Sequence, residues 1–599
     1  MGGRRTSFPR SSVLEPRRPT LTLVVSRASL NNALVRHGND RGWLSFSNPT
    51  TTRTIWELDE VLDALSEAEL AAQDGSWVVG MLSYDAGPAF DPAVSSLRDP
   101  DTPLVAFGVF DDPTPSSGPE VAPFEISEWE PDQDFAHYRK AIDAVRENIA
   151  AGETYQVNYT MRRHATFWGS AEGLFAALSR AQNAKHDAFL HFGSHALCSA
   201  SPELFFTREG NRLLSRPMKG TRPRHFDPET DAAIAEELTS SLKDRAENVM
   251  IVDMVRNDLG RVADVGTVAV PHLLEIERYP TVHTMTSTVV AESSANLVDT
   301  LRSLYPVASI TGAPKYRTTE IIADLEASPR GAYCGSVFVF SPDGRWEFNV
   351  IIRSVWLDLE NGRGTYGVGG GIVWDSSAEN EWEEAEHKSR VLARAGKPLS
   401  LLETMAWTPD GGVSLRQRHI NRLLSAGDHF GIHVDMDEVM GLLNTVRSDT
   451  PVKLRLLIDA AGEATLEVGA MPAEDGEPRS LPIDTEPTDP YDEFLVFKTT
   501  IRGRYEDAMA RFPDAPDVIL WNRRGELTET CIANLVLELD GQLVTPHHSS
   551  GLLPGTLREE LLDRGQITET VLTLDDLKQA TRIWTINSVR GWDSVSLRS

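Results

Sequence analysis

A change in character near residue 398 limits what this chain can fold into more than any other feature. Its 599 residues are too many for one hydrophobic core, so at least two large domains are expected. Helix-like and strand-like segments alternate up to about residue 395, and a new apolar run begins at 398–404. We therefore predict an α/β (α+β) protein in which a first part, divided into 21–120 and 121–396, precedes a second part at 399–599.

Composition excludes several classes of function. The formal net charge of −30 argues against nucleic-acid binding, and no apolar run approaches the length of a membrane span. The three cysteines lie far apart without metal-ligand spacing, which indicates a reducing, cytoplasmic location. Residues 1–20 carry five arginines but no apolar core, so we predict a disordered basic tail.

Local patterns predict several elements. Apolar spacing predicts helices at 55–71 and 135–151, and alternation predicts strands at 21–25, 78–83 and 155–160. The Pro- and Ser-rich stretch 112–119 is typical of a linker, and 472–490 is typical of a polar connector.

Two acidic clusters suggest a metal site. Helical spacing places Glu381, Glu384 and Lys388 on one face, and Asp244 and Glu247 form a similar pair in 242–262. Four carboxylates on two helices could hold Mg²⁺, which prefers oxygen ligands. Each cluster alone is more simply explained as a solvated helix face.

A lysine in the segment 216–223 is the first candidate nucleophile. Lys219 precedes Gly220 between two arginines, although a surface lysine in a turn is the simpler interpretation for an isolated motif. The segment 309–315 leads into a helix whose N-terminus favours anions. Glycines at 367–371 predict a turn that lets the backbone approach a ligand.

These motifs occur in a characteristic order. The motifs that follow one another along the chain are GETYQVNYT, SASPELFF, RPMKGTRPR, LKDRAENVMIVDMVRNDLGRV, VHTMTSTV, ASITGAPK, RGAYCGSVF, IIRSV, VGGGIVWDS and EWEEAEHK. The series resembles the chorismate-utilising enzyme family, over roughly residues 70–395. The resemblance implies a layered α/β fold that binds chorismate and Mg²⁺.

The resemblance also implies roles for individual residues. Glu247 and Glu384 would bind the metal, Asp244 and Glu381 would orient metal-bound water, and Glu203 would be the general acid. The implied substrate-binding positions are Gln156, His283, Thr311, Tyr333, Arg353, Gly369, Gly370 and Lys388.

Two positions decide the branch within that family. Relatives that add water carry lysine where this chain has Gln156, and anthranilate-forming relatives carry alanine where it has Lys219. The resemblance is therefore to the aminodeoxychorismate branch, and it implies that Lys219 is a nucleophile. Asn248 stands where anthranilate-forming relatives usually have histidine, which is compatible with this branch.

A second functional lysine is expected after the break. Lys498 ends the apolar run 494–497, which predicts a short strand. A lysine that forms a Schiff base needs a phosphate site nearby, and candidates are Arg422, Thr556 at a helix start, and Ser588. Glu529 could pair with a pyridinium nitrogen, although each of these residues alone is more simply structural.

In this order the residues resemble the class IV pyridoxal-phosphate family, over roughly 399–595. The resemblance implies a two-subdomain fold and pyridoxal 5'-phosphate (PLP), bound by Lys498, Arg422, Glu529, Thr556 and Ser588. The first strands of that fold are shortened here, because the first part ends only a few residues earlier.

Together the resemblances imply two linked reactions, chorismate amination at C4 and PLP-dependent release of pyruvate, which yield 4-aminobenzoate. We find no glutaminase nucleophile motif, so ammonia is expected from a separate glutamine amidotransferase subunit. A homodimer through the second part is a further expectation. Two alternatives remain open: an anthranilate-forming enzyme fused to an aminotransferase, and a scaffold for the glutaminase.

Overall fold

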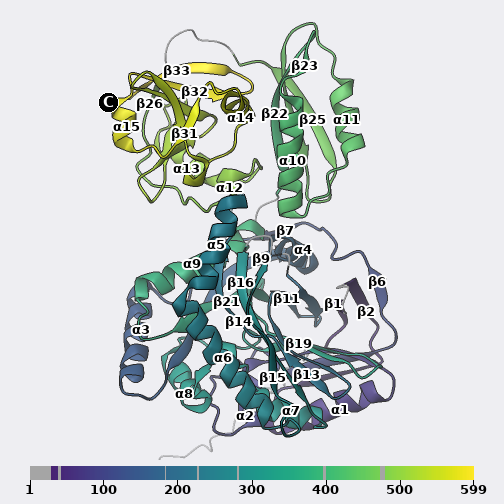
Figure 1. The fold of residues 1–599 in the computed structure, drawn as a ribbon. Coiled ribbons are helices and arrows are strands. Elements are labelled where there is room, and N and C mark those ends of the chain that lie inside the picture. Colours follow the sequence, from purple (N-terminus) through teal and green to yellow (C-terminus); the bar gives the residue numbers. More distant parts are fainter. Residues whose placement is uncertain are drawn as a thin grey trace, which may run out of the picture.

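The computed structural model describes residues 29–37, 42–182, 184–224, 228–278, 282–395, 399–472 and 479–598. The basic tail at 1–20, the strand expected at 21–25 and residues 473–478 of the connector lie outside them. The chain forms a large first region and a smaller second region that sits against one end of the first (Figure 1).

Two large, mostly antiparallel sheets form the centre of the first region. One runs in the order β17 (Gly312–Ala313), β9 (Gln156–Gly169), β21 (Arg363–Ile372), β20 (Ser354–Asp358), β11 (His195–Ser201), β10 (His186–His191), β1 (Asn32–His37), β2 (Gly42–Ser47) and β6 (Thr114–Ser116), with β7 (Phe124–Ile126) and β8 (Glu130–Pro131) beside β9. The other runs β14 (Met218–Pro223), β16 (Val282–Glu292), β13 (Arg212–Ser215), β12 (Leu204–Glu209), β19 (Trp346–Asn349), β18 (Ser336–Phe340), β4 (Trp77–Leu82), β5 (Val105–Phe110) and β3 (Thr51–Ile55), with β15 (Ala269–Arg278) beside β16.

Successive side chains of a strand point to opposite faces of its sheet, and this alternation explains how the layers of the first region pack. In β4, Val79 contributes to the core between the sheets, whereas Val78 packs into the core beneath the helices. That second core lies between the sheet of β4 and the helices that cover it, α1 (Val61–Gln73), α6 (Leu242–Gly260) and α7 (Leu297–Leu304). The sheet of β9 is covered by α3 (Phe135–Ala150), α4 (Ala171–Gln182), α8 (Lys315–Leu325) and α9 (Ala378–Ala395). The result is a helix–sheet–sheet–helix arrangement.

Three local expectations for the first region are wrong in detail. The helix expected at 55–71 begins only at Val61, because Ile55 pairs with Val105 as the end of β3. The expected linker contains β6, whose pairing with β2 extends a sheet edge. The glycines 367–371 lie inside β21 and pair with β9, so they form a strand instead of a turn.

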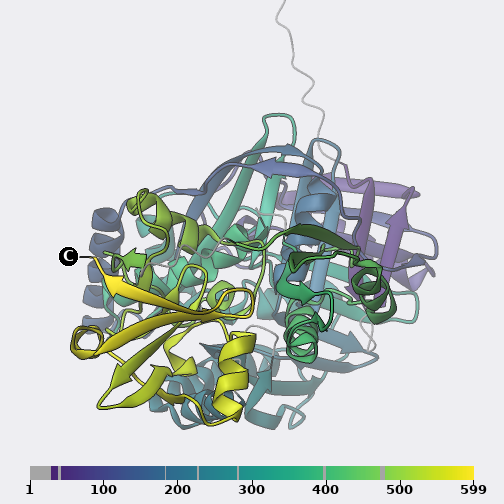
Figure 2. The ribbon, with the colours of Figure 1, turned by 90° about the horizontal axis from the view of Figure 1, so that it is seen from above.

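The second region divides into two subdomains. The first is the sheet β23 (Gly412–Val413), β22 (Leu401–Thr408), β24 (Val452–Ile458) and β25 (Ala464–Ala470), covered by α10 (Arg416–Phe430) and α11 (Met436–Thr445). The second is built on β26 (Arg479–Leu481), β33 (Gly591–Leu597), β32 (Arg582–Asn587), β29 (Asn534–Leu539), β28 (Leu527–Thr530) and β27 (Ile519–Trp521). It also contains β30 (Gln542–Pro546), β31 (Thr568–Thr570), α13 (Gly503–Arg511), α14 (Thr556–Asp563) and α15 (Leu574–Gln579). Figure 2 shows the two subdomains side by side above the first region.

The run before Lys498 also differs from the prediction. Its residues form one helical turn, α12 (Glu493–Val496), because the Asp492 carboxylate caps the amide of Phe494. Extended backbone resumes at Phe497, and the Lys498 carbonyl accepts a hydrogen bond of 3.0 Å from the amide of Leu402 in β22. The lysine is therefore anchored at the seam between the two subdomains.

Two further observations complete the fold. In the part of the chain that the structure describes, no helix combines the length and hydrophobicity needed to span a bilayer. The side chains of Cys198, Cys334 and Cys531 are buried, each with a free thiol.

Candidate active sites

One cavity of about 980 Å³ brings most of the predicted first-region site together. It lies among β14, β21, α6 and α9, with the second region over one side. The predicted site residues that line it are Glu203, Lys219, Asp244, Glu247, Tyr333, Arg353, Gly369, Gly370, Glu381, Glu384 and Lys388. Its size is typical of a small-molecule site.

Lys219 is presented to this cavity by an irregularity in β14. Met218 pairs with Thr286 and Thr221 pairs with Thr284, so three steps on β14 oppose two on β16. Such a bulge re-aims a side chain. Gly220, inside the bulge, has φ of +88°, a conformation that suits glycine. The Lys219 Nζ lies 3.8 Å from Oε2 of Glu247.

Gln156 and Lys219 converge on Gly371. A Cβ added there would lie 2.4 Å from Nε2 of Gln156 and 2.6 Å from Nζ of Lys219, so only glycine leaves both groups in place. Both polar atoms of the Gln156 amide are buried and lack a hydrogen-bond partner among the described residues. An unpaired buried amide is unfavourable, and a polar ligand beside Lys219 would satisfy it.

Glu203 has the properties of a general acid. Burial raises the pKa of its carboxyl to about 7, while a hydrogen bond from Ser309 and the charge of Lys219 act in the opposite direction. The Ser309 hydroxyl donates to Oε1 at 2.7 Å. A carboxyl with this pKa is protonated in a useful fraction of molecules near neutral pH.

The four carboxylates of the predicted metal site face the cavity from α6 and α9, and three of them contact cations. Lys388 lies 2.6 Å from Glu384 and lowers the pKa of that carboxyl to about 2. Glu247 lies between Lys219 and Lys243, and Asp244 accepts a 2.9 Å bond from Arg222.

Burial raises the pKa of the fourth carboxyl, Glu381, despite a hydrogen bond from Ser376. No three of these carboxylates bring ligand atoms within 4.8 Å of one another in the described structure. The donor set nevertheless fits Mg²⁺, which commonly takes one or two protein carboxylates and completes its shell with water and substrate oxygens.

α9 also fixes the substrate-binding wall. A Cβ on Gly370 would lie 3.2 Å from Glu381 and 3.6 Å from both Glu384 and Lys388, so these three side chains meet above this strand glycine. Lys388 donates to the Gly369 carbonyl at 2.8 Å. From the opposite side, Arg353 donates to the Lys388 carbonyl at 2.9 Å.

Arg353 and Tyr333 are held unusually tightly. Arg353 has φ of 54°, a strained backbone conformation that is often found at functional sites. The Tyr333 ring lies so close to Gly367 that an added Cβ would approach its ring atoms at 2.2 Å. Both placements depend on long-range packing.

Besides Gln156, which is fully buried and does not line the cavity, two predicted substrate-binding residues lie behind the cavity wall. His283 is fully buried, with Nε2 2.7 Å from a carboxylate oxygen of Asp231. The Thr311 hydroxyl donates to the backbone carbonyls of Val307 and Ala308. Neither lines the cavity.

Lys498 is the centre of the second site. Burial lowers the pKa of its amine to about 8, and the positive charge of Arg422 adds to the effect. The neutral amine that Schiff-base formation requires is thus accessible near neutral pH. Burial likewise raises the pKa of nearby Glu529 to about 8. Glu529 accepts hydrogen bonds from Tyr505 at 2.8 Å and Asn534 at 3.3 Å.

Two of the three predicted phosphate ligands, Arg422 and Thr556, lie at the start of α14. Arg422 donates to the Pro554 carbonyl at 3.0 Å, directly before that helix, and Thr556 begins the helix. Ser588 lies across the subdomain seam, 3.5 Å from the Thr404 carbonyl. The Arg422 guanidinium, the N-terminus of α14 and the hydroxyls of Thr556 and Ser588 are groups of the kind that bind a phosphate.

Sequence reasoning missed the residues that support these groups. Glu403 accepts two bonds from Arg422, and His419 links Glu403 to Thr556. In the first site it missed Ser309 and Gly371. All four lie within or beside motifs already noted, but nothing in their local spacing shows which atoms they face.

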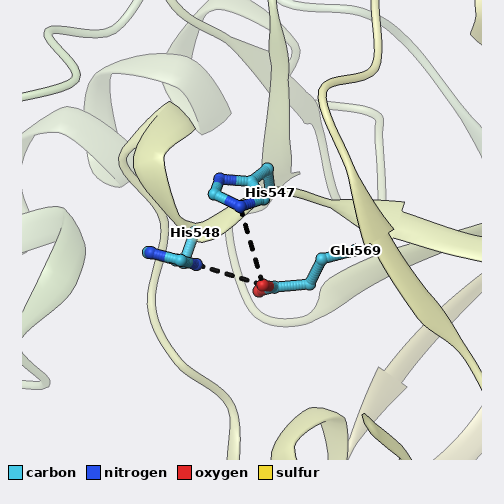
Figure 3. Close-up of side chains that lie close together, drawn as sticks. All are labelled: His547, His548 and Glu569. Carbon is cyan, nitrogen blue, oxygen red and sulfur yellow. Dashed lines mark hydrogen bonds and ion pairs between the residues drawn. The ribbon is translucent and has the colours of Figure 1, made fainter. Parts of the chain in front are cut away.

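A separate polar cluster lies in the second region, where His547, His548 and Glu569 face one another (Figure 3). Among the described residues this is the group whose potential metal ligands come within 4.8 Å. Glu569 already accepts hydrogen bonds from His548 and Arg558, which outweigh burial and lower its pKa to about 2. The cluster therefore ties β31 to the turn after β30.

The fold and the two sites define an enzyme with one small-molecule cavity lined by cations and carboxylates and a second site built around a buried lysine. The chain belongs to the family of chorismate binding enzymes, whose model matches residues 30–394. Residues 400–597 match the amino-transferase class IV model. The resemblances and the α/β fold class expected from the sequence are thereby confirmed.

Individual relatives agree with this assignment. Aminodeoxychorismate synthase component 1 of Salmonella typhimurium is 36% identical over 382 residues, which cover 57% of this chain and 83% of that protein. The Escherichia coli protein of the same name is 42% identical over 45% of this chain and 60% of its own length. Anthranilate synthase component 1 of Streptomyces coelicolor is 38% identical over 45% of this chain and 52% of its own.

A solved structure supports the fold of the first region. Anthranilate synthase component I from Streptococcus pneumoniae has a TM-score of 0.52 and 22% identity, covering 65% of this chain and 95% of that one.

Proposed function

We propose that this chain makes 4-aminobenzoate from chorismate and ammonia in two steps, one in each region. The observation that carries the proposal is the meeting of Lys219 and the unpaired, buried Gln156 amide at Gly371, in the wall of a cavity that Glu203 also lines. C4 amination of chorismate through an enzyme-bound intermediate requires an amine nucleophile and a carboxyl that can donate a proton, and the unpaired amide can bind a polar substrate beside them.

In the first step Lys219 attacks ring C2 of chorismate while the C4 hydroxyl leaves as water. Glu203 supplies the proton to that hydroxyl, and its pKa of about 7 suits this role. Ammonia then adds at C4 and expels the Lys219 amine from C2, which restores the enzyme. The product is 4-amino-4-deoxychorismate.

The carboxylates of α6 and α9 would hold Mg²⁺ together with the substrate carboxylate. Bound Mg²⁺ would neutralise the substrate's ring carboxylate and favour departure of the hydroxyl. Glu247 and Glu384 are the proposed ligands, and Asp244 and Glu381 would orient water on the ion. Lys219, now 3.8 Å from Glu247, would then be free to face the ring.

In the second step Lys498 removes the C4 proton of the aminated product and returns a proton to the departing enolpyruvyl group. Pyruvate leaves and the ring becomes aromatic. PLP bound at this site would supply the electron withdrawal that makes the C4 proton acidic. Glu529 would pair with the cofactor's ring nitrogen, and Arg422, Thr556 and Ser588 would hold its phosphate.

Ammonia is proposed to come from a separate glutamine amidotransferase. The name of the Salmonella relative, component 1, supports a second subunit for that protein. We further propose that the second region forms a homodimer, as the resemblance to class IV enzymes implies.

Product identification tests the proposal directly. The purified chain receives chorismate, ammonium and Mg²⁺, with or without PLP, and products are identified by mass spectrometry. We expect 4-aminobenzoate from the wild-type chain, 4-amino-4-deoxychorismate from Lys498→Ala, and neither from Lys219→Ala. Anthranilate as the wild-type product would refute the proposal and favour the alternative of an anthranilate-forming enzyme.

A further inference from the structure

The cavity that contains Lys219 does not end in the first region. Part of its lining comes from α10 and the segment before Lys498 in the second region, namely Ser425, Asp428, His429, Pro490, Tyr491, Glu493, Val496 and Phe497. We call the whole space the shared chamber. A product released from Lys219 therefore enters a space that is bounded by the other region.

Ion pairs hold the second region over this chamber. α9 turns Glu384 and Lys388 toward the first site, whereas Arg390 of the same helix pairs with Asp489. Glu383 accepts a 2.5 Å bond from Arg523 of the second region. The helix that carries the proposed metal ligand Glu384 and the water-orienting Glu381 thus also docks the second region.

The second site begins directly behind the chamber wall. Phe497 lines the chamber and has extended backbone, with φ −102° and ψ 134°. Because side chains alternate along extended backbone, the next residue, Lys498, points away from the chamber. The wall at this point is a stacked pair, with the His429 and Phe497 rings 4.2 Å apart between centroids.

The first-region part of the chamber carries more cations than acids. In a chain of net charge −30, its cations are Lys219, Arg222, Arg224, Lys243, Arg278, Arg353, Lys388 and Arg390. Its acids are Glu203, Asp244, Glu247, Glu381 and Glu384, and the second region adds Asp428 and Glu493. The negative field of the whole chain would slow the return of a dicarboxylate that had escaped into solution. One molecule confined to about 980 Å³ has a local concentration on the order of 1 M.

We propose that the aminated dicarboxylate intermediate passes from Lys219 to Lys498 through the shared chamber without release into solution, the rings of His429 and Phe497 moving aside to admit it. This proposal rests on the proposed function. The molecule that is transferred is a cyclohexadiene that carries one amine and two carboxylates. His429 and Phe497, which form the chamber wall before Lys498, would select it by size.

Isotope dilution tests the proposal in the intact chain. Carbon-13 chorismate and ammonium are supplied together with an excess of unlabelled 4-amino-4-deoxychorismate, and the label in 4-aminobenzoate is measured from the first turnovers. Transfer through the chamber predicts product label several-fold above that of the bulk intermediate pool. Product label equal to the bulk pool would overturn the proposal, whereas a lack of any 4-aminobenzoate would refute the proposed function instead.

An equimolar mixture of Lys219→Ala and Lys498→Ala chains calibrates free diffusion, because each full-length chain retains one working site. We expect this mixture to show a lag and full dilution of label.

Ser425→Trp, which places an indole in the chamber, should dilute the label in the product while the amination rate persists. The neighbouring Leu424→Trp is a matched control, since Leu424 is 40% exposed on the same helix but does not line the chamber. Undiminished label in Ser425→Trp, or equal loss in Leu424→Trp, would show that this chamber is not the route.

Discussion

Removal of the Ser309 hydroxyl should move the pH dependence of amination by a measurable amount. Ser309→Ala deletes the 2.7 Å hydrogen bond to Glu203. A hydrogen bond to a charged group contributes about 1.5–3 kcal/mol, and 1.36 kcal/mol corresponds to one pH unit. Because the bond stabilises the ionised carboxylate, its loss raises the pKa. With water partly replacing the hydroxyl, we expect a rise of roughly 1 unit.

The sign of the effect follows from the role of Glu203. A general acid works in its protonated form, so the high-pH side of the kcat/KM profile for chorismate should fall as pH rises through about 7. In Ser309→Ala this fall should occur roughly 1 unit higher. The assay follows formation of the aminated product, with total ammonium adjusted at each pH to keep free ammonia constant.

A second buried pair gives a matched control. Ser179 donates at 2.6 Å to Asp187, and burial raises the pKa of that carboxyl to about 7, but neither residue lines the cavity. Ser179→Ala should leave the profile unchanged. The assignment of Glu203 as the acid is refuted if Ser309→Ala keeps the wild-type profile, or if both variants shift it equally.

Three further outcomes are expected. Gly371→Ala should lower the kcat of amination at least ~100-fold, because the added methyl group would occupy the space of the Lys219 amine. Gly469→Ala, whose methyl group would lie in open space, should leave kcat unchanged, and equal rates in the two variants would contradict this geometry. PLP uptake by Lys498, trapped with borohydride and located by mass spectrometry, should rise with pH and level off above about 8; a flat profile would contradict the lowered pKa. Asp489→Asn weakens the contact with Arg390 on α9. This variant should need a few-fold higher Mg²⁺ concentration for half-maximal amination, with an unchanged PLP content. An unchanged Mg²⁺ dependence would show that docking of the second region does not position α9.

Helical and strand periodicity predicted most of the elements that carry the sites. The apolar spacing at 135–151 matches α3, and the carboxylates spaced by three on α6 and α9 do face one cavity. The failures have tertiary causes. Glycines at 367–371 have a local preference for a turn, but pairing with β9 makes them strand, and an Asp492 cap makes a helical turn of the apolar run 494–497.

Placement of single atoms was less predictable than the identity of the residues. Motif order pointed to both Gln156 and Thr311, yet only Gln156 reaches the Lys219 amine, while the Thr311 hydroxyl is used by the backbone. His283 likewise belongs to a motif, but its imidazole is bonded to Asp231 behind the wall. Hydrogen-bond partners of this kind lie far away in the sequence, so local patterns carry no information about them.

The sequence by itself predicted the two-part division, the α/β class and the two lysines proposed to be reactive, because periodicity and motif order are properties of the chain. Only the tertiary structure decided how those lysines are tuned and connected. Burial of Lys498 and Glu203 shifts their pKa values toward neutrality, and a bulge with Gly371 opposite sets Lys219 against Gln156. The shared chamber likewise exists only because α9 carries one site and docks the other region. These properties arise from desolvation and long-range packing, which depend on residues that meet only after the chain has folded.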